Sequence, residues 1–146
     1  MIMLADIKPF IKPVTRETVP DTPEEIAQVE ADFSILPEVY KNLLLEYGPF
    51  GFRGYADLTG GAIDDLTVFI CYGAGSQHTI YSLQNGIEEV FRNRWTPFAR
   101  DEYGSIYALD RDDATIWFFD IEAGFTPTKV FSSMQTFLDA IIVEPF

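Results

Sequence analysis

The spacing of apolar residues predicts a helix that begins at Thr22. Thr22-Pro-Glu-Glu25 has the form of a capping box, with Pro23 at the first helical position and Glu25 at the third. Apolar side chains then recur every three or four residues, at Ile26, Val29 and Phe33. The predicted helix therefore has one narrow apolar face, and its other side is acidic.

A second helix is predicted to begin at Pro37. Gly48 follows its last apolar position, where a glycine is favoured, and Pro49 comes next. The residues that share its apolar face are Tyr40, Leu43, Leu44 and Tyr47. We expect this face to pack against the core.

Short apolar runs between turn residues predict strands in the middle of the chain. Leu66 to Tyr72 is interpreted as one strand, and Thr79 to Leu83 as another. Helical spacing then returns for a short segment that ends near Asn93, with apolar positions at Ile87, Val90 and Phe91.

The last third of the chain predicts a hairpin and a closing helix. The strands are Ser105 to Leu109 and Thr115 to Phe119, which are rich in aromatic and branched residues and are joined by a turn at Asp110 to Asp113. Lys129 to Phe131 adds a strand. Ser132 and Gln135 then form a second capping box before a helix with the apolar face Phe137, Leu138, Ile141 and Ile142.

These elements indicate an α+β fold, a single domain with a largely antiparallel central sheet flanked by helices. Three prolines in the first twenty residues argue against sustained structure there. We therefore predict an irregular arm over residues 1–20, with at most one edge strand, and a domain over residues 21–146.

The charge of the chain limits its partners. The 146 residues carry 10 Lys and Arg against 23 Asp and Glu, a net charge of −13, and residues 21–146 hold 21 of the acids and 7 of the bases. Such a surface repels nucleic acid and anionic membranes and attracts basic proteins. A net negative charge also keeps a protein soluble, so the charge alone does not distinguish a binder of basic proteins from a protein that is acidic only for solubility.

The N-terminal segment and the single cysteine are informative about cellular location. The N-terminal segment has no basic leader, and Asp6 and Lys8 interrupt its apolar run, so we expect no signal peptide and a cytoplasmic protein. With Cys71 alone, no internal disulfide and no cysteine zinc site can form. No apolar run approaches the roughly 20 residues that cross a bilayer.

Candidate catalytic and metal-binding groups are sparse. Cys71 and the single histidine, His78, could form a dyad, but the intervening glycines do not fix their geometry. Asp110, Asp112 and Asp113 could converge on a cation, yet the run lacks the later ligands of a calcium loop, so solvated turn acids are the favoured interpretation. Adjacent acids point apart, so no glycosidase pair is established. We expect no catalytic, metal-binding or cofactor-binding residue.

The predicted protein-binding residues are acids in turns and one exposed aromatic. Most aromatic side chains are explained as core, whereas Tyr55 and Tyr103 fall in loops. We predict that a partner is contacted by Asp64, Asp65, Asp101, Glu102, Tyr103, Asp112 and Asp113.

Three segments of the chain resemble the SUKH superfamily, which includes fungal glucan-synthesis regulators and bacterial immunity proteins. The segment Glu25 to Gly48 is similar to the opening helix pair of the family. Trp95 to Asp110 resembles its apolar-Pro-Phe-Ala stretch, glycine turn and strand ending in Leu-Asp, with Tyr103 where a second glycine often stands. Ser132 to Ile142 resembles the closing helix.

The resemblance implies a sheet flanked by helices, no catalytic residues, and a surface that binds a protein, often a nuclease toxin. The expected function is therefore that of an immunity protein that neutralises a basic toxin by direct binding. A regulator of cell-wall glucan synthesis acting through protein contacts is the alternative within the family. A small hydrolase using acidic residues is the alternative outside it. The sequence leaves the toxin and the oligomeric state undetermined.

Overall fold

The computed structural model describes residues 7–75, 78–85 and 93–145. Its elements, in chain order, are η1 (Lys8–Phe10), β1 (Ile11–Pro13), α2 (Pro23–Asp32), α3 (Glu38–Tyr47), β2 (Phe50–Phe52), β3 (Gly54–Leu58), β4 (Leu66–Val68), β5 (Ile70–Cys71), α4 (Ile80–Gln84), β6 (Trp95–Arg100), β7 (Ile106–Asp110), β8 (Ile116–Asp120), η3 (Ile121–Ala123), β9 (Thr126–Phe131), α5 (Met134–Asp139) and β10 (Ile141–Pro145).

The first two helices begin where their sequences predict, and the second also ends where its sequence predicts. The Thr22 side chain accepts a hydrogen bond from the backbone of Glu25, and the Glu25 carboxylate accepts one from the backbone of Thr22, which confirms the capping box. Helix α3 follows Pro37 and ends at Gly48, whose φ is +71°. A side chain at Gly48 would collide with the backbone of Val19, so a glycine is needed there.

The described strands form two sheets, and every pairing between these strands is antiparallel. In the part of the chain that the structure describes, the large sheet has the order β1-β2-β5-β6-β7-β8-β9, and the small sheet has the order β10-β3-β4. The predicted hairpin is confirmed as β7 and β8, with Ile106 opposite Phe119. The fold is therefore α+β with antiparallel sheets, as the sequence indicates.

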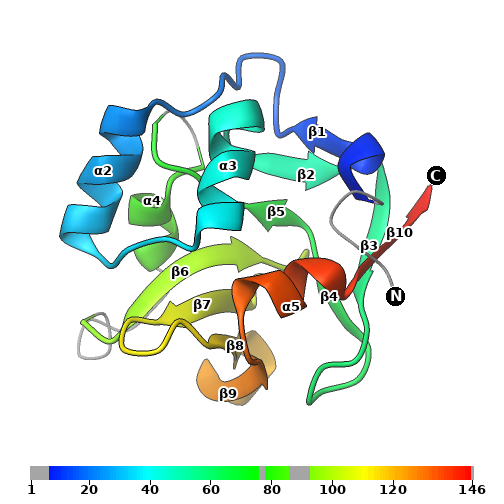
Figure 1. Ribbon diagram of the computed structural model, residues 1–146. Helices are drawn as coiled ribbons and strands as arrows, with labels where there is room; N and C mark the ends of the chain where they lie inside the picture. The colour runs from blue at the N-terminus through cyan, green and yellow to red at the C-terminus, as the bar shows by residue number, and fades with distance from the viewer. Residues whose placement is uncertain (1–6, 76–77, 86–92, 146) are drawn as a thin grey trace.

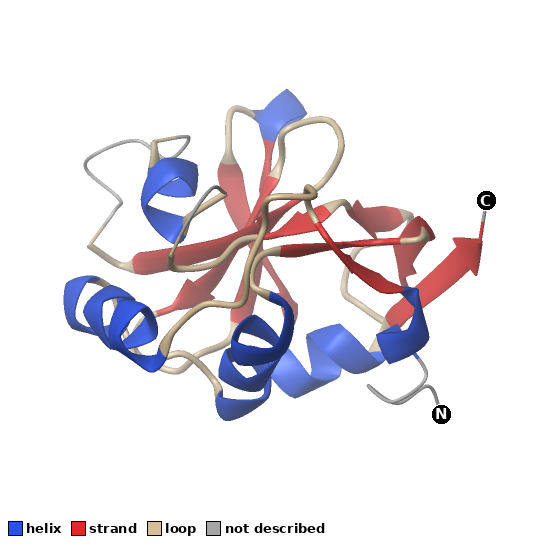
Figure 2. Cartoon of the chain, turned by 90° about the horizontal axis from the view of Figure 1, so that it is seen from above, coloured by secondary structure: helices blue, strands red, loops and turns tan. Residues whose placement is uncertain are grey.

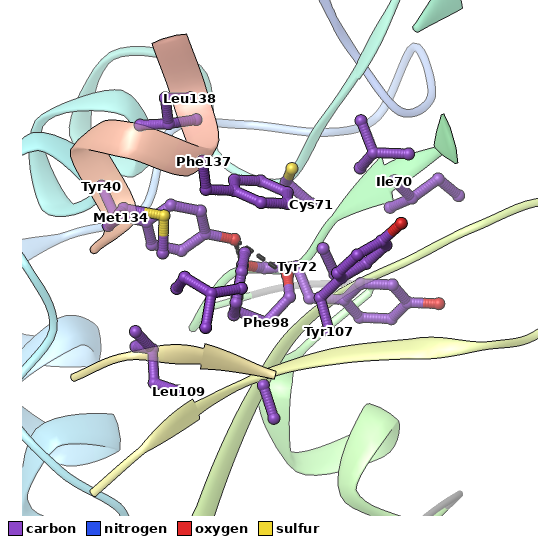
Figure 3. Close-up of a cluster of buried hydrophobic side chains, with 14 of the residues drawn as sticks. Tyr40, Ile70, Cys71, Tyr72, Phe98, Tyr107, Leu109, Met134, Phe137 and Leu138 are labelled. Carbon is purple, nitrogen blue, oxygen red and sulfur yellow. Dashed lines mark hydrogen bonds between the residues drawn. The ribbon is translucent and has the colours of Figure 1, made fainter. Parts of the chain in front are cut away.

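Helices α2, α3 and α5 lie on one side of the large sheet (Figures 1 and 2). Aromatic rings from two of these helices meet those of strand β6 in the core (Figure 3). The ring centroids of Tyr40 and Phe98 are 5.5 Å apart, and those of Phe98 and Phe137 are 5.2 Å apart. The Tyr40 hydroxyl donates to the backbone oxygens of Tyr72 at 2.6 Å and Phe98 at 3.0 Å, so this buried polar group is satisfied.

Three elements predicted from the sequence are wrong, and Tyr55, which was expected in a loop, lies in strand β3. Thr79 to Leu83 is no strand, because the Thr79 side chain caps a short helix, α4, in which Ile80 and Leu83 are both buried. Leu66 to Tyr72 is no continuous strand: the chain leaves the small sheet after Val68 and joins the large sheet at Ile70.

The third wrong prediction concerns the closing helix. Ser133, rather than Ser132, is its N-cap and accepts from the backbone of Thr136, so Gln135 takes no part in a capping box. Ile141 and Ile142 belong to strand β10, which pairs with β3. The short helix predicted to end near Asn93 has its apolar positions outside the described residues.

The N-terminal arm contributes an edge strand. Strand β1 pairs with β2, with Ile11 opposite Phe52, and both side chains are buried. Part of residues 1–20 is therefore packed on the large sheet, and the division of the chain at residue 20 stays a prediction.

Candidate protein-interaction surface

The turn between β6 and β7 presents two side chains to solvent. Oδ1 of Asp101 accepts hydrogen bonds from the backbone nitrogens of Tyr103 and Ser105, each at 2.9 Å, and Gly104 has a φ of +102°. Asp101 itself is buried, so its carboxylate serves the turn and is not a free surface acid. Glu102 is exposed, and Tyr103 is 71% exposed.

Strand β4 lies beside this turn. The Tyr107 hydroxyl donates to the backbone oxygen of Thr67 at 2.7 Å, and the backbone nitrogen of Phe69 donates to the carbonyl oxygen of Arg100 at 2.9 Å. These bonds bring the β3–β4 connection, with its exposed Asp64 and Asp65, next to the β6–β7 turn.

A third segment, from the end of β8 into η3, completes the surface. Asp120 caps η3 by accepting from the backbone of Glu122, and the Ser105 hydroxyl oxygen accepts from the backbone of Ile121 at 2.9 Å. The second bond ties η3 to the residue that follows the Asp101 turn. Glu122 and Ile121 are exposed.

The three segments enclose an open depression of about 350 Å³, which we name the acidic hollow. None of the described residues that line it is basic. They are Ile63, Asp64, Asp65, Leu66, Thr67, Asp101, Tyr103, Ser105, Phe118, Asp120, Ile121 and Glu122. Five carboxylates around one exposed aromatic side chain produce a negative potential that favours a cationic protein surface.

The structure does not bring Asp112 and Asp113 to the hollow. They are exposed in the turn between β7 and β8, at the opposite end of β7 from the Asp101 turn. Asp113 accepts from the backbone and the hydroxyl of Thr115, and these hydrogen bonds lower the pKa of Asp113. Asp110 accepts a hydrogen bond from the backbone of Asp112, so the carboxylates of Asp110 and Asp113 both stabilise the backbone of this turn.

Asp120 and Glu122 belong to the hollow but were not predicted from the sequence. The hairpin pattern contained the information, because the last residue of the second strand of an antiparallel hairpin lies beside the first residue of the first strand. Asp120 ends β8 and is thereby placed near Ser105, directly after the Asp101 turn.

The two residues considered for a catalytic dyad, Cys71 and His78, are buried and partly buried, respectively. Cys71 is fully buried, and burial raises the pKa of its thiol, which disfavours the thiolate that a nucleophile requires. The His78 ring packs against Tyr72, and burial, together with the charge of Arg100, lowers the pKa of His78. Within residues 7–75, 78–85 and 93–145, no group of three or more His, Cys, Asp or Glu is placed to hold a metal ion.

Comparison with protein families identifies the relationship that the three segments suggest. The model of the SMI1 / KNR4 family (SUKH-1) matches residues 20–140. The chain belongs to this family. No curated protein and no solved structure matches it significantly.

Membership in SUKH-1 supports an immunity or regulator-like domain. SUKH domains are generally non-catalytic and bind partner proteins such as toxins. The matched range includes the whole acidic hollow, from Ile63 to Glu122. No described helix of this SUKH-1 chain has the length and apolar character to span a membrane.

Proposed function

We propose that this SUKH-1 domain is a cytoplasmic immunity protein that neutralises a basic, nuclease-type toxin by binding it without catalysis. The observation that carries the proposal is the acidic hollow, in which five carboxylates and no described basic side chain surround Tyr103. A nuclease binds the phosphate backbone with Lys and Arg side chains, and such a basic surface is complementary in charge to the acidic hollow.

The charges and the aromatic side chain have different tasks in this proposal. Exposed carboxylates such as Asp64, Asp65 and Glu122 accelerate the encounter with a cationic partner. Tyr103 is 71% exposed and offers a large apolar ring with a polar tip, which is typical of residues that dominate binding energy once buried. The hydrogen bonds that Asp101 accepts fix the backbone that carries this ring before binding.

The proposal requires a toxin gene beside the gene of this protein. The test uses the nuclease domain encoded there and measures its activity against increasing amounts of the purified immunity protein. We expect inhibition that is complete at about one equivalent. If no adjacent gene encodes a toxin, or if the encoded nuclease remains fully active, the toxin hypothesis is wrong and the regulator interpretation of the family replaces it.

Two matched charge reversals locate the surface. Glu122→Lys changes an exposed acid of the hollow, and Asp112→Lys changes an exposed turn acid at the opposite end of β7 by the same charge. We expect Glu122→Lys to slow association with the nuclease by roughly tenfold at low salt, and Asp112→Lys to have a much smaller effect. Equal slowing would mean that the overall charge, and not the hollow, guides the encounter.

A further inference from the structure

A second depression lies beside the acidic hollow, at Phe69. In the small sheet, Asp57 is opposite both Thr67 and Ile142, and Tyr55 is opposite Glu144. Because directly opposite residues project to the same side of a sheet, these five side chains share one face. The alternate residues Ala56, Leu58 and Val68 are buried, so the shared face is the outer one.

Phe69 is exposed because the chain changes sheets at this residue. It lies between Val68, the end of β4, and Ile70, the start of β5 in the large sheet. Its backbone nitrogen is bonded to Arg100, while 49% of the residue remains accessible. The Arg100 guanidinium lies over the ring, 5.2 Å from its centroid, so the ring is held at the boundary of the two sheets with part of its surface open to solvent.

Two hollows meet at Phe69, and we name them together the Phe69 crevice. The smaller, of about 120 Å³, is mainly apolar and is lined by Lys12, Val14, Gly51, Phe52, Gly54, Val68, Phe69 and Ile70. The larger, of about 300 Å³, is lined by Gly54, Tyr55, Ala56, Asp57, Thr67, Val68, Phe69, Glu102 and Glu144. The smaller hollow is below the usual size of a small-molecule site, roughly 300–1,000 Å³, and is suited to a single side chain.

The charges around the larger hollow define its occupant. Asp57, Glu102 and Glu144 line it, and none of its described lining residues is basic. The basic groups of the crevice lie elsewhere, because Lys12 lines the smaller hollow and the guanidinium of Arg100 lies over the Phe69 ring. The acidic rim of the larger hollow complements a Lys or Arg that flanks an apolar side chain seated at Phe69. The Phe69 crevice also adjoins the acidic hollow, since Thr67 lines both and the consecutive residues Glu102 and Tyr103 line one each.

We propose that the Phe69 crevice is the apolar anchoring site for the same basic toxin, and that it receives an apolar side chain from a basic loop of that toxin. This inference rests on the proposed function, because the occupant is the partner that the acidic hollow attracts. The interface then has two kinds of contact: the exposed carboxylates of the acidic hollow, which mainly determine association, and the apolar contacts of Tyr103 and the Phe69 crevice, which mainly determine dissociation.

The test compares Phe69→Ser with Ile35→Ser. Ile35 is 77% exposed, lies in the connection between α2 and α3, and lines none of the three hollows. Ile35→Ser therefore removes an exposed apolar side chain away from the proposed interface. The probe is the inactive nuclease domain of the toxin encoded beside this gene, and dissociation is followed by surface plasmon resonance. We expect Phe69→Ser to raise the dissociation rate at least about tenfold and Ile35→Ser to leave it unchanged.

A second variant protects the test against a general loss of structure. Asp57→Lys lies on the outer face of the small sheet, opposite Thr67, and reverses one rim charge without removing a buried side chain. We expect it to weaken binding at least fivefold while thermal unfolding stays unchanged. Hydrogen exchange in residues 54–58 and 66–69 should slow in the complex.

The outcomes separate this inference from the proposed function. A toxin that is inhibited and sensitive to Glu122→Lys, but insensitive to both Phe69→Ser and Asp57→Lys, overturns the crevice and leaves the proposed function intact. Absence of any complex with the wild-type protein overturns both.

Discussion

Glu102 and Tyr103 are consecutive in the chain, but Glu102 lines the Phe69 crevice and Tyr103 lines the acidic hollow. The five-residue connection between β6 and β7, residues 101–105, therefore contributes to both depressions. Its shape depends on the hydrogen bonds that Asp101 accepts and on the positive φ of Gly104. Changes to these two structural residues should act on stability first and on binding through Glu102 and Tyr103.

Gly104→Val should destabilise the protein by more than about 1 kcal/mol. A β-branched residue is strained at a φ of +102°, and a Cβ at this position would approach Cδ1 of Ile121 to 3.2 Å. Chemical denaturation measures the change in the free energy of unfolding. Glu102→Val, which puts the same side chain at an exposed position of the turn, is the control. An unchanged midpoint for Gly104→Val would show that the turn tolerates a side chain there.

Asp101→Ala should cost roughly 1–3 kcal/mol, because the backbone nitrogens of Tyr103 and Ser105 lose their shared acceptor and Ser105 is buried. Asp101→Asn keeps a side-chain oxygen and should lose less than half of that amount. Urea unfolding of the two variants gives the comparison. Equal losses in both variants would mean that the charge, and not the acceptor geometry, stabilises the turn.

Local patterns in the sequence were sufficient for the first two helices and for the hairpin. The capping box of α2 involves only Thr22 and its near neighbours, so no tertiary information is needed. The break at Phe69 is different, because it depends on a hydrogen bond to Arg100, 31 residues away, that draws the chain into another sheet. The spacing of apolar residues therefore cannot predict that the strand is interrupted at Phe69.

Only part of the candidate surface could be predicted, because local sequence patterns identify turns but not the long-range contacts that bring turns together. Turn composition identified Asp64, Asp65 and the Asp101 turn as acidic loops, and the structure places them around one hollow. Composition could not show that the Asp101 carboxylate is buried and accepts hydrogen bonds from the backbone of its own turn. It also could not place Asp112 at the far end of β7, which follows only from the pairing of β7 with β8.

Tyr81→Phe should raise the pKa of Asp32. The Tyr81 hydroxyl donates to the Asp32 carboxylate, and this bond is the main reason why the pKa of Asp32 is lowered, with Gln28 contributing less. Burial and the bond to Asp32 raise the pKa of Tyr81 to about 12, so its hydroxyl stays a donor throughout the acidic range. Carboxyl ¹³C NMR titration should show a larger rise in the pKa for Tyr81→Phe than for Gln28→Ala.

The same change predicts a pH dependence of stability. An aspartate whose pKa is lower in the folded state contributes stability above its unfolded pKa and loses it as the pH falls through the folded pKa. The wild type should therefore exceed Tyr81→Phe in stability at neutral pH, and the difference should shrink as the pH falls below the ordinary pKa of an aspartate, 3.8. The Phe33 ring, whose centroid is 5.3 Å from that of Tyr81, keeps its contact in both proteins. A difference that is constant with pH would exclude the carboxylate as its source.

Salt should separate the contributions of the acidic side chains and of Tyr103 to toxin binding. Raising the ionic strength screens exposed charges, so it should slow association of the wild type with the neighbouring nuclease domain more than it accelerates dissociation. Asp64→Asn with Asp65→Asn should slow association and reduce this salt dependence, because both carboxylates line the hollow and are exposed. Tyr103→Ala should instead increase dissociation by about tenfold and leave the salt dependence of association unchanged. Stopped-flow association at several salt concentrations, with dissociation measured by competition, tests both parts. If the association rate ignores both salt and the removal of these carboxylates, the acidic-surface mechanism is wrong even when the nuclease is still bound.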